Sequence, residues 1–159
     1  MFNLFKKKNS SPVKRANAIL LPDKIVIETW NSSGDGSSVI TDHLTVLETI
    51  ASDTEIGFVL RKHLNDSVHS VFTKEELLKT RASYRKKIKV KSDKAFFEIA
   101  LCVAASLEND TISLNSYRTR AKDKMYVGNP PSIKNISVKI DDEALGKEIR
   151  MAWEKCEIT

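Results

Sequence analysis

The sequence is poor in the residues that mark several classes of protein. Its 159 residues include two cysteines, five glycines and four prolines, too few for a disulfide framework, a cysteine-based zinc site or a low-complexity chain. No apolar run approaches the ~20 residues needed to span a bilayer. The start, Met-Phe-Asn-Leu-Phe followed by lysines, lacks the apolar core and cleavage site of a secretory signal. We therefore expect a reduced, cytoplasmic protein without stable membrane association.

Motifs of enzymes are also missing. The glycine-rich stretch 34–38 lacks the lysine of a phosphate-binding loop, and there is no Gly-x-Ser-x-Gly elbow. The histidines His43, His63 and His69 do not have the spacing of a metal site. A small phosphodiesterase that uses His43 or His69 with a lysine is an alternative that these residue types leave open. The sequence otherwise predicts no catalytic residue, no metal site and no cofactor.

Charge is distributed unevenly along the chain. The 26 basic and 21 acidic residues give a net charge of +5, but residues 1–15 contain five bases and no acid. Residues 16–60 contain seven acids and one base, whereas residues 61–94 contain eleven bases and four acids. We expect 1–15 to be a flexible basic tail, either solvated or touching a membrane or phosphate. Residues 16–159 are long enough for one folded domain.

Local signals predict both helices and strands after the tail. A short helical turn is expected after Pro12. Capping residues predict helices that begin at Asp42, Ser52, Thr73, Asp93 and Asp141. β-Branched or alternating residues predict the strands 24–30, 38–40, 102–108, 111–117, 124–127 and 136–140. Helices that fall between pairs of strands indicate the α+β class, in which one antiparallel sheet packs with several helices in a single domain.

Two segments combine residue types that bind macromolecules. Residues 81–91 contain six bases around Tyr84, a composition that suits nucleic acid but also a solvated surface. Nucleic-acid binding through 81–91 is therefore an alternative function, although the rest of the chain offers no second basic patch. The other segment contains tyrosines and arginines, which dominate protein interfaces. Its members are Tyr117, Arg118, Arg120 and Tyr126.

The second half of the chain resembles a known family. The features that carry the resemblance are the hairpin 102–117, the segment 117–120, Tyr126-Val-Gly128 and the closing helical stretch 144–153. In this order they resemble the immunity proteins of bacterial contact-dependent growth inhibition (CDI), and the order of elements agrees over residues 20–156. The resemblance implies a protein that is not an enzyme and that binds and neutralises the toxin domain encoded beside it. It leaves the basic tail unexplained.

Resemblance and charge together predict how such a protein inhibits its toxin. Carboxylates that cover the substrate groove of a cationic nuclease would block the groove and speed association. We expect the partner to be a toxin C-terminal domain, a nuclease acting in the cytosol, with no small-molecule substrate involved. Tyr117, Arg118, Arg120 and Tyr126 are a second expected contact. The first expected contact consists of acids in the first third of the chain: Asp23, Glu28, Asp35, Asp42, Asp53 and Glu55.

Overall fold

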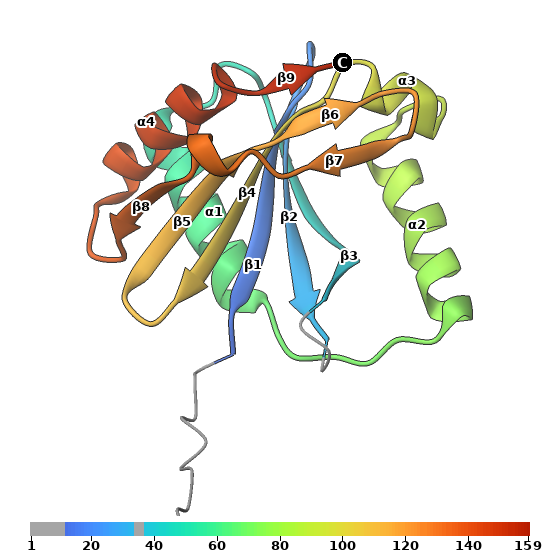
Figure 1. Cartoon of the computed structure of the whole chain (residues 1–159), viewed down its shortest axis with the longest axis horizontal. Coiled ribbons are helices and arrows are strands. Elements are labelled where there is room, and N and C mark those ends of the chain that lie inside the picture. The colour runs from blue at the N-terminus through green and yellow to red at the C-terminus, as the bar shows by residue number, and fades with distance from the viewer. Residues whose placement is uncertain (1–11, 34–36) are drawn as a thin grey trace, which may run out of the picture.

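Six antiparallel strands form the main sheet, with the strand nearest the N-terminus close to its centre (Figure 1). The computed structural model describes residues 12–33 and 37–159. The strand order is β3-β2-β1-β4-β5-β8. The bounds are β1 (Lys14–Leu20), β2 (Ile25–Ser32), β3 (Ser38–Leu47), β4 (Leu101–Glu108), β5 (Thr111–Ser116) and β8 (Lys134–Ser137). Together with the helices, this sheet confirms the expected α+β class.

Strand β1 lies where a helical turn was expected. It pairs with β2 on one side and with β4 on the other. Ala16 and Ala18 face one side of the sheet and Ile19 faces the other, and all three are fully buried. The helical prediction after Pro12 is wrong because two neighbouring strands satisfy the backbone of β1. Lys14 and Arg15, which we assigned to the basic tail, are the first residues of this strand.

The helix expected to begin at Asp42 is also wrong. Residues 38–47 form the edge strand β3, which pairs with β2 from Ser32↔Ser38 to Ile25↔Leu47. The apolar spacing of Leu44 and Leu47 fits a helix, but the same ten residues contain several β-branched side chains, which favour a strand. A bulge between Glu28 and Trp30 interrupts the pairing.

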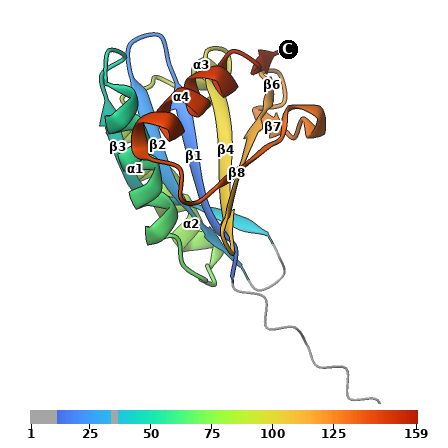
Figure 2. The same cartoon turned by 90° about the vertical axis from the view of Figure 1, so that its left-hand side faces the viewer.

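Two helices cover one side of the sheet, which we call the packed face (Ala16, Ala18, Ile25, Ile27, Val103, Ala105, Ile112 and Leu114). They are α1 (Asp53–Asp66) and α4 (Asp142–Trp153), and they lie together on this side (Figure 2). Gly57 and Gly146 mark their crossing: a Cβ atom on Gly57 would overlap the backbone of Asp142, and one on Gly146 that of Asp53. The two helices therefore approach as closely as their backbones allow.

The other side of the sheet, which we call the open face (Asn17, Ile19, Val26, Glu28, Trp30 and Cys102), is covered by smaller elements. Helix α2 (Lys74–Ile88) buries only Tyr84 and Ile88, and α3 (Asp93–Phe97) buries only Phe96. A small sheet of order β7-β6-β9 lies at one end of the molecule (Figure 1). Its strands are β6 (Arg118–Arg120), β7 (Met125–Val127) and β9 (Glu157–Ile158), and a 3₁₀ turn, η1 (Pro130–Ser132), follows β7.

The remaining local predictions agree closely with the structure. Ser52, Thr73 and Asp141 cap α1, α2 and α4, and Thr73 forms a full capping box with Glu76. The hairpin of β4 and β5 turns at Asn109, which adopts a left-handed conformation with φ of 52°. Strand β8 spans residues 134–137 rather than 136–140. None of the helices in residues 12–33 and 37–159 is long and apolar enough to cross a membrane.

Candidate binding cavity on the open face

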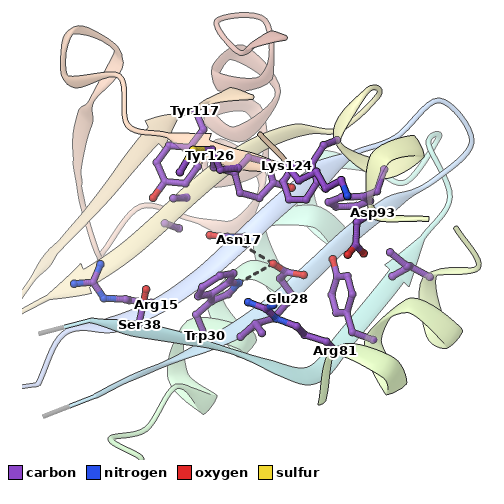
Figure 3. A pocket seen from close by; sticks show the side chains of 18 of the residues that line it. Arg15, Asn17, Glu28, Trp30, Ser38, Arg81, Asp93, Tyr117, Lys124 and Tyr126 are labelled. Atoms are coloured by element: carbon purple, nitrogen blue, oxygen red, sulfur yellow. Dashed lines mark hydrogen bonds between the residues drawn. The ribbon is translucent and has the colours of Figure 1, made fainter. Parts of the chain in front are cut away.

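A cavity of about 660 Å³ opens between the open face of the sheet and the elements that partly cover it. Strands β1 and β2 supply Asn17, Glu28 and Trp30, whereas α2 and β7 supply Tyr84 and Tyr126. Figure 3 shows these strand residues below the tyrosines of β5–β7, with Glu28 in the middle. This volume and this mixture of aromatic and polar groups are typical of sites that bind a ligand or part of a partner.

Glu28 is a buried acid inside this cavity. Its side chain is 1% exposed, and its Oε1 accepts hydrogen bonds from Trp30 Nε1 at 2.7 Å and Asn17 Nδ2 at 3.2 Å (Figure 3). Its Oε2 is buried and has no hydrogen-bond partner among the described residues. Burial raises the pKa of Glu28, and the polar groups of Tyr84, Trp30 and Asn17 only partly offset this effect. The cavity therefore contains an acceptor oxygen that has no hydrogen-bond partner among the described residues, although the Tyr84 hydroxyl also favours the charged form of this carboxyl group.

An arc of five aromatic rings borders the cavity. Tyr117 stacks on Tyr126 with ring centroids 5.7 Å apart, and Tyr126 lies 5.1 Å from Phe97. Phe97 contacts Phe96 at 5.3 Å, and Phe96 contacts Tyr84 at 6.4 Å, both edge to face. These contacts join α2, α3, β7 and the end of β5, so the wall of the cavity is continuous although its residues come from distant parts of the chain.

Basic side chains lie around this aromatic wall. Arg15, Arg81, Arg85 and Lys124 line the cavity with a single exposed acid, Asp93. Arg85 Nε is 3.8 Å from Asp93 Oδ1, and Arg15 Nε is buried without a hydrogen-bond partner among the described residues. The cavity thus combines a cationic rim with a buried carboxyl group.

The acids expected to contact a toxin do not share one surface. Asp23 is exposed beside Lys24, 3.2 Å away, and Glu55 is exposed in the first turn of α1. Asp53 accepts a 2.6 Å hydrogen bond from Arg150 across the α1–α4 crossing. Asp42 lies on β3 and faces α2, whereas Glu28 is in the cavity. Asp35 lies outside the described residues.

Asp42 joins the edge strand to helix α2. Its Oδ2 accepts a hydrogen bond from Ser83 at 3.0 Å and lies 3.4 Å from Lys87 Nζ. These contacts, led by the hydrogen bond from Ser83, lower the pKa of Asp42. Within the basic segment 81–91, Lys87 and Arg85 are therefore engaged by acids of the same chain, and Arg81 lines the cavity.

The tyrosines and arginines of the second expected contact separate into two sets. Tyr117 and Tyr126 both line the cavity. Arg118 and Arg120 do not line the cavity. Arg118 forms an exposed ion pair with Glu157 at 3.2 Å, and Arg120 forms one with Asp123. Three residues named from the sequence as toxin contacts therefore line the cavity: Tyr117 and Tyr126, which the sequence analysis grouped, and Glu28, which it placed in a separate set.

Several cavity residues were missed by sequence reasoning. Asn17, Trp30, Phe96 and Phe97 were not proposed, yet all four line the cavity. One signal was available for β2: residues 25–30 are apolar on both faces apart from Glu28 and Thr29, a pattern typical of a strand buried on both sides. Glu28 could accordingly have been expected to be buried.

Two of the histidines, His43 and His63, form a structural cluster on the packed face, whereas His69 is exposed. His63 is fully buried, and its ring nitrogens lie 2.8 Å from Thr29 Oγ1 and 2.9 Å from Thr45 Oγ1. Burial, followed by the charge of His43, lowers the pKa of His63 to about 4. His43 pairs with Asp66 at 2.8 Å. No group of three potential metal ligands occurs within the described part of the chain.

Of the comparisons with known proteins, the one with family models identifies a family. Residues 14–156 match the model of the family CdiI, described as CDI immunity protein. A protein of unknown function, NMB0488 from Neisseria meningitidis, has a similar structure, with a TM-score of 0.82 and 16% identity over 94% of this chain and 98% of that chain. A chain in a CdiA-CT/CdiI toxin and immunity complex from Yersinia pseudotuberculosis gives a TM-score of 0.80 and 16% identity over 94% and 100%. These two structures share the fold. The comparison with curated proteins gives no match.

Proposed function

This chain belongs to the CDI immunity protein family, and from that premise we propose that it binds a toxin domain directly at the cavity on the open face. The observation that carries the proposal is the cavity itself. It combines aromatic walls with a buried donor and a buried acceptor that have no partners among the described residues. Groups of this kind are satisfied when a partner supplies the missing hydrogen bonds.

We further propose that binding covers the active site or substrate groove of the toxin, which is a nuclease acting in the cytosol. In this role the chain is an inhibitor and not an enzyme. Two observations support a protein partner: the tyrosines at the cavity, which are common in interface centres, and the relative in Yersinia pseudotuberculosis whose structure is a toxin and immunity complex.

Co-expression with the toxin domain encoded beside this chain tests the proposal. We expect the cells to survive and the two proteins to co-purify at moderate salt. The cavity is tested by Ala104→Trp, because Ala104 lies on β4 and lines the cavity. The bulky side chain should fill the cavity and abolish both protection and co-purification. Thermal unfolding of the variant shows whether the fold is retained.

Thr54→Trp is the matched control, because Thr54 is exposed on α1, on the other side of the sheet. This variant should protect cells as well as the unaltered protein. Cell death despite soluble expression of the unaltered chain, with no complex, would contradict toxin binding. A folded Ala104→Trp variant that still protects would place the docking surface elsewhere.

Two acids of the first third of the chain, Asp35 and Asp42, make a second, electrostatic contribution in this proposal. Charge reversal at Asp35 and Asp42 should slow association with the toxin by about tenfold at low salt and weaken its salt dependence. Stopped-flow association at several salt concentrations measures both effects. Glu108→Lys is the control, since Glu108 is exposed at the far end of β4. Unchanged association rates would remove the Asp35–Asp42 region from the interface.

A further inference from the structure

The unused oxygen of Glu28 indicates what kind of group enters the cavity. Among the described residues Oε2 is without a partner, while Oε1 already accepts two hydrogen bonds. A buried carboxylate is costly without compensating charge or hydrogen bonds. A partner therefore stabilises this site most if it brings a positively charged donor.

The geometry favours a donor that needs a single oxygen. The planar guanidinium of arginine binds carboxylates best through two parallel hydrogen bonds, which require both oxygens. At Glu28 one oxygen is occupied by Trp30 and Asn17. A lysine ammonium is a compact point charge on a flexible apolar stem, so it can reach Oε2 alone.

The surroundings of Glu28 suit the rest of a lysine side chain. Trp30, Tyr84 and Phe96 supply apolar and aromatic surface within the cavity. Aromatic faces attract an ammonium group by cation–π interaction, and they also cover its methylene stem.

The basic rim selects how this lysine is presented. Arg15, Arg81, Arg85 and Lys124 would repel an isolated cation at the entrance. A lysine on a protein segment with acidic or neutral neighbours is repelled less by this rim, because those neighbours offset its charge. A free small amine has no such neighbours and is repelled fully.

We propose, on the basis of the toxin-binding function above, that a lysine side chain of the toxin enters the cavity and donates a hydrogen bond from its ammonium group to Glu28 Oε2. In this contact Glu28 is the central binding residue of the interface, and the lysine ammonium group is the feature of the toxin that Glu28 recognises.

Glu28→Gln is the decisive variant, because glutamine keeps the size of the side chain, removes its charge and replaces one acceptor oxygen with an amide donor. Isothermal titration with toxin separated from the co-expressed complex and refolded should show affinity lower by about 10- to 100-fold, the range for a charge-assisted hydrogen bond. Glu108→Gln, at an exposed acid at the end of β4, is the control and should bind normally.

A double-mutant cycle identifies the partner residue. Each toxin lysine is changed to methionine and titrated against the unaltered protein and against Glu28→Gln. One lysine should weaken binding to the unaltered protein but have little further effect with Glu28→Gln. Titration at several pH values should show coupling that grows as Glu28 ionises. The other charged groups that line the cavity are Arg15, Arg81, Arg85, Asp93 and Lys124. Tyr84, Tyr117, Tyr126 and the Cys102 thiol face the same region, and burial raises the pKa of each, so they stay neutral.

The outcomes separate this inference from the proposed function. Normal affinity of Glu28→Gln, or the absence of any coupled lysine, overturns the lysine contact, while failure of Ala104→Trp to bind still supports cavity docking. Normal binding by both folded variants overturns both proposals.

Discussion

The two faces of the sheet differ in how completely they are covered. On the packed face, α1 buries six residues and α4 buries five, and the helices meet at two glycines. On the open face, the fifteen-residue α2 buries two residues and leaves room for a cavity of about 660 Å³. The difference teaches that the two faces of one sheet can differ in role: the packed face supplies stability, and the open face keeps the uncovered surface and polar groups on which the proposed binding depends.

The largest effect is expected at the helix crossing. Gly146→Ala should destabilise the protein by about 3 kcal/mol, because the new methyl group overlaps the Asp53 carbonyl and the backbone cannot yield cheaply. Helix propensity alone would favour alanine by about 1 kcal/mol. Gly128→Ala is the control, since its Cβ would lie 3.6 Å from Asn115 Nδ2, an ordinary contact. Urea denaturation measures the free energy of unfolding of both variants. Equal values would contradict the idea that the close helix crossing stabilises the packed face.

The next effect concerns pH on the packed face. Because the folded pKa of His63, about 4, is below its unfolded value, the neutral form stabilises the native state. That contribution is complete above pH 6.5 and is lost as pH falls from about 6.5 toward 4, by about 2–3 kcal/mol. Asp66, His43 and Lys62 are the charged or titratable neighbours. Chemical denaturation between pH 7.5 and 4 measures the free energy of unfolding at each pH. Its decrease with falling pH should be smaller in His63→Gln but unchanged in His69→Gln, since His69 is exposed.

A smaller effect separates structural acids from binding acids. Asp53→Asn should cost about 1–2 kcal/mol, because Arg150 donates to Asp53 at 2.6 Å and to the Ala51 carbonyl at 2.5 Å across the crossing. Glu75→Gln, which removes an exposed ion pair with Lys79 on α2, should cost about 0.3 kcal/mol. Chemical denaturation compares the two variants. Should Asp53→Asn weaken toxin binding beyond its loss of stability, Asp53 would belong to the interface after all.

The smallest effect has the opposite sign. Since burial raises the pKa of Glu28, the native state favours the protonated acid, and stability is lost as pH rises from about 4.5 through the folded pKa. Glu28→Gln should remove this loss and gain about 1 kcal/mol at neutral pH. The same variant is expected to bind toxin less well. Thermal unfolding at pH 4.5 and 7.5 tests the gain, and a variant that is less stable at both values would make Glu28 a structural residue.

Local signals in the sequence predicted the helices well because caps act over three residues. Ser52 accepts from the Glu55 amide at 3.1 Å, and Asp141 accepts from the Ala144 amide at 2.7 Å. The errors arose where pairing partners lie far away. Strand β3 carries a cap-like Asp42 but pairs with β2, and β1 is defined by β4, more than eighty residues later. Tertiary pairing overrides a local signal in both.

The cavity was harder to predict than the fold. Glu28, Tyr117 and Tyr126 were named from the sequence as toxin contacts, but the sequence did not predict that Glu28 is buried. The aromatic arc depends on contacts among residues 84, 96, 97, 117 and 126. No sequence pattern within one segment predicts that these five aromatic residues meet, because they come from distant segments that the fold brings together only after the strands have paired.

The glycine crossing also determines when the polypeptide can fold during synthesis. Gly57 meets α4 only after residues 142–153 have been made, since its contact is with Asp142. At about 5–20 residues per second, a ribosome needs several seconds to extend the chain from α1 to α4. During that interval the apolar stripe of α1, including Ile56 and Leu60, lacks its helical partner. A nascent chain is therefore most vulnerable to aggregation and proteolysis just before its last helix emerges.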